Sequence, residues 1–311
     1  MRNTLVPAII KIFSVLPLGV SRALGACIGT CLWLIKGRDY RITLGNIRLC
    51  FPELALAEAQ QLSRLSLIET AKTAIEVGAI WRNSWEWLQT KIVSVEGEAL
   101  LHEEIAKGQG LLVLSPHLGN WEVIAHYIAS KAPLTAMYQP FAIPAVDELI
   151  LKGRSKTNIH MAPTNRKGLC MLLKALQDGK AVGILPDQLP KKDAGSDFAP
   201  FFGQNTLTMS LAHSLITRTH CRVISAFAMR VEGGFKIVVV PVAPEIYSDD
   251  LAESLRGLNL SVEACVRFAP AQYQWEYNRF RFPKSHREFR QQKGLAHAEP
   301  ADCIKFVTKD R

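Results

Sequence analysis

Apolar residues recur with two different spacings along the chain. From Ala55 to about Gln89 they repeat every three or four residues, which predicts a long helical region. After Lys91, short β-like runs alternate with helical stretches. The predicted strands are Ile92–Val95, Gly110–Ser115, Leu134–Tyr138, Asn158–Met161, Ala181–Leu185, Arg222–Arg230 and Lys236–Pro241, and the predicted helices are Ala99–Lys107, Trp121–Ser130, Val146–Lys156, Gly168–Asp178 and Thr208–Thr219. This alternation predicts an α/β fold with a mostly parallel central sheet flanked by helices, in which the last two strands form an antiparallel hairpin.

The N-terminal pattern differs from the rest. Residues from Leu5 to Ile35 are mainly apolar, and Pro17 and Gly19 predict a break between two halves. The uncharged stretch Ala23–Ile35 is shorter than the ~20 apolar residues that a bilayer span requires. We therefore expect a membrane-associated helical region that lies in the plane of the membrane or re-enters it. A buried first helix of a soluble domain and a cleavable signal peptide are the alternatives.

Charge is concentrated at the two ends. The net charge is +9, and residues 1–50 contain seven Lys or Arg and one Asp, while residues 279–311 contain nine Lys or Arg and four acids. Basic ends attract anionic lipids or acidic protein partners, and no nucleic-acid-binding motif is present, so no nucleic acid is expected as a partner. We predict three parts: a membrane-associating segment at 1–50, an α/β domain at 51–294 and a polar tail at 295–311. Seven cysteines without a C-x-x-C motif predict reduced thiols.

The strongest candidate chemistry lies in the stretch Gly110–Ile128. An apolar run ends at Pro116, and His117 follows where catalytic groups of open α/β sheets commonly lie. A turn containing Gly119 and Asn120 separates His117 from Glu122, in the first turn of the next predicted helix. We expect the Glu122 carboxylate to contact the imidazole and fix its tautomer, leaving the other ring nitrogen as a base. Alternatively, Glu122 is a helix-terminal charge and His117 a polar residue at a strand end.

Two further segments are candidates for the same site. Asp187 and Gln188 follow another apolar run, where they are either cleft residues or turn residues. Arg154 lies near the end of a predicted helix. There it is either a charge that interacts favourably with the helix dipole, a ligand for a phosphate, or a partner of Asp187. The other histidines lack metal-ligand spacing, and no G-x-S-x-G, P-loop or G-x-G-x-x-G motif occurs, so no metal or cofactor is expected.

Seven blocks spread over almost the whole chain together resemble the bacterial lipid A secondary acyltransferases, the lauroyl and myristoyl transferases of lipid A biosynthesis. The blocks are RITLGNIRLCFPE (41–53), HLGNWE (117–122), MYQP (137–140), Arg154, GKAVGILPDQ (179–188), PFFGQNTLT (200–208) and YQWEYNRFRFP (273–283). The resemblance implies a glycerolipid-acyltransferase-like fold. Gln139 departs from the family pattern, which usually has Arg at this position, and this leaves the identity of the acceptor open.

The resemblance also implies roles for individual residues. His117 is expected to be the general base and Glu122 its orienting acid. Arg154 and Asp187 match family site positions, and Gln188, Asn120 and Thr208 are the other substrate-binding candidates. Oxyanion donors are expected among the amides near Gly119 and Asn120, or from Arg154.

The implied reaction transfers a fatty acyl group from an acyl carrier protein thioester to a hydroxyl of a lipid A precursor. The implied location is the bacterial inner membrane, with the active site facing the cytoplasm and an anionic glycolipid as the acceptor. The sequence leaves three alternatives open. They are an acyltransferase for another envelope glycolipid such as a phosphatidylinositol mannoside, a thioesterase, and a non-catalytic membrane lipid carrier.

Overall fold

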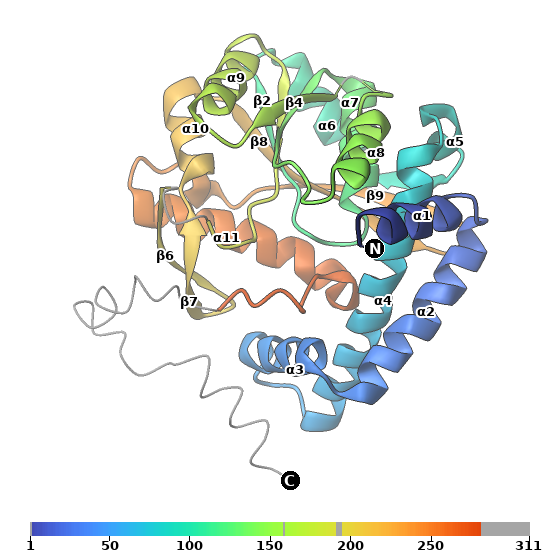
Figure 1. Ribbon diagram of the computed structural model, residues 1–311. Coiled ribbons are helices and arrows are strands. Elements are labelled where there is room, and N and C mark those ends of the chain that lie inside the picture. The colour runs from blue at the N-terminus through green and yellow to red at the C-terminus, as the bar shows by residue number, and fades with distance from the viewer. Residues whose placement is uncertain (1, 158, 191–194, 281–311) are drawn as a thin grey trace.

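Seven strands form one sheet in the order β1-β9-β8-β2-β5-β3-β4 in the computed structural model, which describes residues 2–157, 159–190 and 195–280 (Figure 1). The strands are β1 (Ile92–Glu96), β2 (Leu111–Leu114), β3 (Leu134–Tyr138), β4 (Ile159–Pro163), β5 (Ala181–Ile184), β8 (Arg222–Val231) and β9 (Gly234–Pro241). Neighbouring strands are parallel except β8 and β9, which form the predicted antiparallel hairpin. The predicted fold class is confirmed.

Helices surround this sheet. They are α1 (Arg2–Ser14), α2 (Leu18–Ile35), α3 (Arg38–Cys50), α4 (Leu56–Arg82), α5 (Trp85–Gln89), α6 (Glu98–Ala106), α7 (Trp121–Lys131), α8 (Pro144–Arg154), α9 (Arg166–Gln177), α10 (Leu211–Thr219) and α11 (Leu251–Phe268), with short 3₁₀ turns at Pro244–Tyr247 and Pro270–Gln272. The predicted break between the two N-terminal apolar halves is confirmed, since α1 ends before Pro17 and α2 begins after it.

The central strand β2 is buried on both faces, and its alternate side chains enter different parts of the core. Leu111 and Val113 pack with side chains of α6 and α7. Leu112 and Leu114 pack with side chains of α9, α10 and α11. A parallel strand covered on both sides reads as a continuous apolar run, which explains why Gly110–Ser115 was recognisable from sequence.

A second, two-stranded sheet was not predicted. It consists of β6 (Ser196–Phe201) and β7 (Gln204–Met209), joined by a tight turn in which Phe202 and Gly203 both have positive φ. Three consecutive β7 residues, Thr206 to Thr208, are buried, so the alternation that marks a strand is missing. The predicted helix Thr208–Thr219 was therefore wrong at its start, and α10 begins at Leu211. The helix α11 was also not predicted.

The helix α2 runs alongside α4 (Figure 1). A methyl group added at Gly25 or Gly29 would lie 2.6 Å from the Cα of Lys72 or 2.4 Å from that of Ile68, so only glycine allows this close packing. The opposite face of α2 exposes uncharged side chains, including Val20, which is 51% exposed. Among the described residues, α2 is the one helix long and apolar enough to cross a membrane, judged by length and composition.

Candidate active site

Two neighbouring parallel strands bring His117 and Asp187 to the same edge of the sheet. Leu114 of β2 lies opposite Ile184 of β5 in the register, and each is the last residue of its strand. His117 and Asp187 each follow three residues later in sequence. Because parallel strands share the edge at which they end, the two side chains meet there although 70 residues separate them.

The Asp187 carboxylate holds His117 in two ways. One carboxylate oxygen lies 2.8 Å from Nδ1 of the imidazole, and the other accepts a 2.8 Å hydrogen bond from the His117 backbone N–H. Asp187 is 2% exposed; burial alone would raise its carboxyl pKa, but the electrostatic contact and the hydrogen bonds with His117 hold that pKa below its ordinary value. An ionised carboxylate only accepts hydrogen bonds, so in the neutral imidazole Nδ1 carries the proton and Nε2 has the lone pair.

The Gln188 side chain lies against that lone pair. Its amide nitrogen is 3.1 Å from Nε2 of His117 and 3.4 Å from the side-chain oxygen of Gln274. Since Nε2 accepts, the Gln188 amide donates. The structure thus places the Gln188 amide on Nε2, with Gln274 beside that amide, and the His117 side chain is 14% exposed.

The predicted contact between His117 and Glu122 is wrong. The Glu122 carboxylate instead receives two hydrogen bonds from the Arg154 guanidinium, at 2.6 and 3.0 Å. Burial alone would raise the pKa of Glu122, but the charge and hydrogen bonds of Arg154 outweigh it and lower that pKa. The alternative that Arg154 pairs with Asp187 is excluded by the same geometry, because its partner is Glu122.

The start of α7 explains this outcome. Trp121 is the first residue of α7, and its ring lies edge-on to the imidazole with the centroids 5.0 Å apart. Successive helix residues are ~100° apart around the axis, so with Trp121 beside His117 the next side chain is turned away from it. Glu122 therefore reaches the end of α8, where Arg154 lies.

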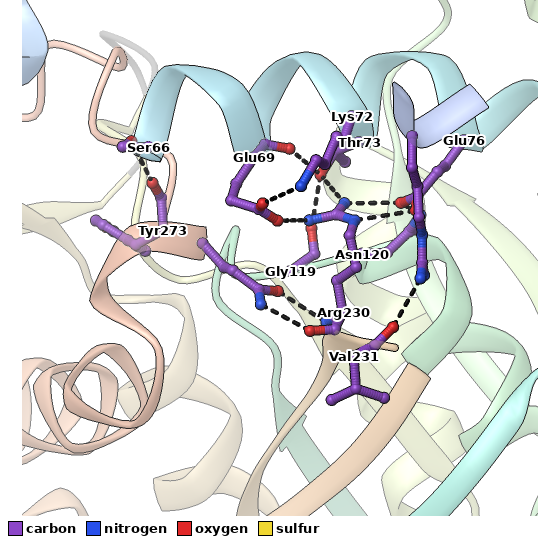
Figure 2. A network of polar contacts seen from close by, with 12 residues as sticks. Ser66, Glu69, Lys72, Thr73, Glu76, Gly119, Asn120, Arg230, Val231 and Tyr273 are labelled. Atoms are coloured by element: carbon purple, nitrogen blue, oxygen red, sulfur yellow. Dashed lines mark hydrogen bonds and ion pairs between the residues drawn. The ribbon is translucent and has the colours of Figure 1, made fainter. Parts of the chain in front are cut away.

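A buried charge network holds the turn between His117 and α7 (Figure 2). The hydroxyl of Thr73 on α4 lies 3.1 Å from the carbonyl oxygen of Gly119, and the Asn120 side chain lies 3.4 Å from the Glu76 carboxylate. Gly119 has φ +62°, and a Cβ there would come 2.0 Å from the carbonyl oxygen of Ala228. Glycine is required because both the conformation and the close approach exclude a side chain.

Arg230 of β8 is the centre of this network. Its guanidinium donates to Glu76 at 2.7 and 2.9 Å, to Thr73 at 2.7 Å and to Glu69 (Figure 2). Arg22 of α2 also donates to Glu76, at 2.6 Å. These contacts tie α2, α4 and the sheet to the turn that positions His117. Sequence reasoning missed them because charged residues 54 to 161 positions apart carry no local signal.

The remaining candidates are buried in structural contacts. Asn120 is fully buried, and Thr208 of β7 is fully buried and accepts a 2.9 Å hydrogen bond from Asn259. The backbone N–H groups of Gly119 and Asn120 already donate to the carbonyls of Gln272 and Ala228, at 3.0 and 2.9 Å. The expectation that these amides serve as oxyanion donors is therefore wrong for this arrangement.

The segment after α11 contributes to the site, although the sequence analysis predicts no role for its residues. The backbone N–H of Gln274 donates to the carbonyl oxygen of His117 at 3.0 Å, and Leu118 forms a bridge with Tyr273. The signal that could have found these residues was their place in the block at 273–283, one of the seven that carry the family resemblance.

A buried carboxylate on Nδ1 of a histidine leaves Nε2 as the acceptor nitrogen, and this arrangement can remove a proton from a hydroxyl or a water. The family comparison identifies the class more closely. The model of the bacterial lipid A biosynthesis acyltransferases matches residues 2–282, and the chain belongs to this family.

Individual relatives are similar along most of the chain. It is 26% identical over 276 residues to a protein named lipid A biosynthesis lauroyltransferase from Escherichia coli (strain K12), covering 86% of this chain and 87% of the relative. It is also 26% identical over 272 residues to the lipid A biosynthesis palmitoleoyltransferase of the same strain, covering 86% of each. A lipid A biosynthesis acyltransferase of Haemophilus influenzae is 26% identical over 276 residues. The chain is therefore an acyltransferase by family.

Proposed function

We propose that this protein transfers a fatty acyl group from an acyl carrier protein thioester to a hydroxyl of a lipid A precursor at the bacterial inner membrane. The observation that carries the proposal is the contact between His117 and the buried Asp187, beside the Gln188 amide. A base oriented by a carboxylate is suited to activating a hydroxyl, and the family supplies the lipid A acceptor.

In the proposed reaction, Nε2 of His117 takes the proton of the acceptor hydroxyl, and the oxygen attacks the thioester carbonyl. The new C–O ester bond forms, the C–S bond breaks, and the thiolate leaves with the proton returned by the imidazolium. Asp187 stabilises that imidazolium, as the acidic partner of a base histidine does. General-base help of this kind contributes ~10²–10⁴-fold to a rate.

Gln188 and Glu122 have distinct proposed roles. The Gln188 amide lies next to Nε2 and gives way to the acceptor hydroxyl on binding, which leaves its N–H groups to donate to the developing oxyanion. Glu122 acts as a positioning residue, because it anchors Arg154 and so fixes α8 against the first turn of α7. Asn120 shapes the turn before α7 and Thr208 supports the β6–β7 hairpin through Asn259.

We propose that α2 lies in the membrane plane with the active site on the cytoplasmic side. One face of α2 is fixed to the protein by Arg22, which donates to Glu76 and to the backbone carbonyls of Val231 and Gly234 at 2.7 Å. A helix bound in this way along α4 offers only its other, apolar face to lipid. The basic residues 36–41 directly after it suit the anionic cytoplasmic surface.

The decisive experiment supplies the purified protein with acyl carrier protein thioester and a lipid A precursor. Acylated lipid and free carrier thiol should appear in equal amounts, and His117→Ala should abolish both while leaving thermal unfolding unchanged. Thiol release without acylated lipid would indicate a thioesterase, and release of neither would indicate a lipid carrier. Retained turnover in His117→Ala would remove this histidine from the mechanism.

A further inference from the structure

A cavity of about 360 Å³ lies between α1, the C-terminal part of α4 and α8. It is distinct from the His117 site, although α8 also carries Arg154. The cavity wall includes Ile10, Gly78, Trp81 and Leu149, which are apolar or lack a side chain. Four cations also line it, and all four are exposed: Lys11, Arg82, Lys152 and Lys156.

The positive charge of this cavity is not neutralised by the protein. Its lining contains no acidic residue. Among the ion pairs between described residues, none involves Lys11, Arg82 or Lys152. Lys156 donates to the carbonyls of Trp81, Arg82 and Asn83 at the end of α4, and burial together with repulsion from Lys152 and Arg82 lowers its pKa. Three cations are therefore left for a ligand.

The cavity borders the apolar surface of the N-terminal helices. Val15 lines the cavity and is 56% exposed, and Ile12 on α1 is 61% exposed. A ligand that combines an anionic group with hydrocarbon chains would satisfy both parts of the site, because the cations attract its charge and the exposed apolar side chains lose contact with water.

We infer that this cavity binds the phosphate headgroup of an anionic phospholipid of the membrane, with its acyl chains along Ile12 and Val15. The charged lining selects a phosphate, and the apolar neighbours select a lipid over a free anion. The site anchors and orients the protein, and it requires no acyl transfer. The acceptor glycolipid is a separate ligand, bound near His117.

The test measures binding of the full chain to phosphatidylcholine vesicles with and without phosphatidylglycerol, by co-sedimentation. Each basic residue near an anionic surface contributes ~1 kcal/mol, so removing three is expected to weaken binding to the phosphatidylglycerol vesicles about 100-fold. The variant is Lys11→Gln/Arg82→Gln/Lys152→Gln. The matched control removes the same charge from α9, as Arg166→Gln/Lys167→Gln/Lys174→Gln. It should keep the preference for vesicles that contain phosphatidylglycerol over vesicles of phosphatidylcholine alone.

A second variant tests the cavity itself. Leu149→Trp fills it without a change in charge and should reduce the preference for phosphatidylglycerol, while inorganic phosphate at equal concentration should not displace the vesicles. Equal losses in both triple variants, or an unchanged preference in Leu149→Trp, would overturn the inference. Displacement by inorganic phosphate would identify a free-anion site instead.

The acyl-transfer assay separates this inference from the proposed function. In detergent without phosphatidylglycerol, the cavity triple variant should show unchanged turnover and an unchanged KM for the acceptor. If it binds phosphatidylglycerol vesicles like the unmodified protein but has a raised KM for the acceptor, the cavity belongs to the substrate and the inference is wrong.

Discussion

Replacing Asp187 by Asn should remove the base without unfolding the protein. The carboxylate accepts from both Nδ1 and the backbone N–H of His117, each at 2.8 Å. In Asp187→Asn the single carbonyl oxygen keeps the backbone hydrogen bond, because the backbone donor cannot change. The amide NH₂ then faces Nδ1 and must donate to it, which moves the imidazole proton to Nε2. A protonated Nε2 has no lone pair for the acceptor hydroxyl.

The expected fall in kcat is large because Asp187→Asn removes both the tautomer with an unprotonated Nε2 and the carboxylate that stabilises the imidazolium. The same change beside a base histidine lowers kcat about 10⁴-fold in a serine protease, and we expect a fall of about 10³–10⁴-fold here, or ~4–5.5 kcal/mol in the barrier. Asn has nearly the same shape as Asp and keeps the hydrogen bond to the His117 backbone N–H, so the protein should remain folded, with a smaller fall in Tm than a change that strands a buried arginine.

The assay is steady-state transfer of a labelled acyl group from its carrier protein to the lipid A precursor, with Tm measured on the same preparations. Asp187→Glu serves as the conservative control, since it keeps an acceptor-only group and should retain more activity than Asp187→Asn. A rate for Asp187→Asn within tenfold of the unmodified protein would refute the argument that Asp187 sets the tautomer of His117.

Two further predictions concern buried ion pairs. Glu122→Gln leaves the Arg154 guanidinium without its countercharge, which should destabilise the fold by about 3–5 kcal/mol. The double variant Glu122→Gln/Arg154→Met should recover part of that stability. A loss of transfer rate at an unchanged Tm would instead indicate that Glu122 belongs to the catalytic dyad. Glu76→Gln should destabilise by a similar ~3–5 kcal/mol at pH 7, because Arg230 and Arg22 both lose a carboxylate. Burial alone would raise the pKa of Glu76, but the two arginines lower it, so the ionised carboxylate stabilises the fold above the unfolded pKa, and this contribution is lost as pH falls through the folded pKa. The difference in unfolding free energy between the unmodified protein and Glu76→Gln, measured in denaturant titrations, should therefore become smaller below about pH 4.5. A difference that does not change with pH would contradict this.

Much of the architecture was readable from local pattern. The seven strands of the main sheet came from apolar runs, and β3 was predicted with its observed bounds. The hairpin β6–β7 was missed because its turn uses Phe202 rather than Asn or Asp, and because Thr206 to Thr208 are all buried. The predicted tail at 295–311 lies outside the described residues.

The pattern of residues along the chain identified the candidates for chemistry. His117, Asp187 and Gln188 each follow an apolar run, and the ends of such runs meet at one edge of a parallel sheet. It did not determine how these residues pair. Glu122 is five residues from His117 and is the partner that sequence proximity predicts, yet Asp187, 70 residues away, holds the imidazole. The adjacency of β2 and β5 decides this, together with the place that Trp121 takes beside the ring. Strand order and helix rotation are properties of the packed molecule, which is why nearness in sequence gave the wrong carboxylate.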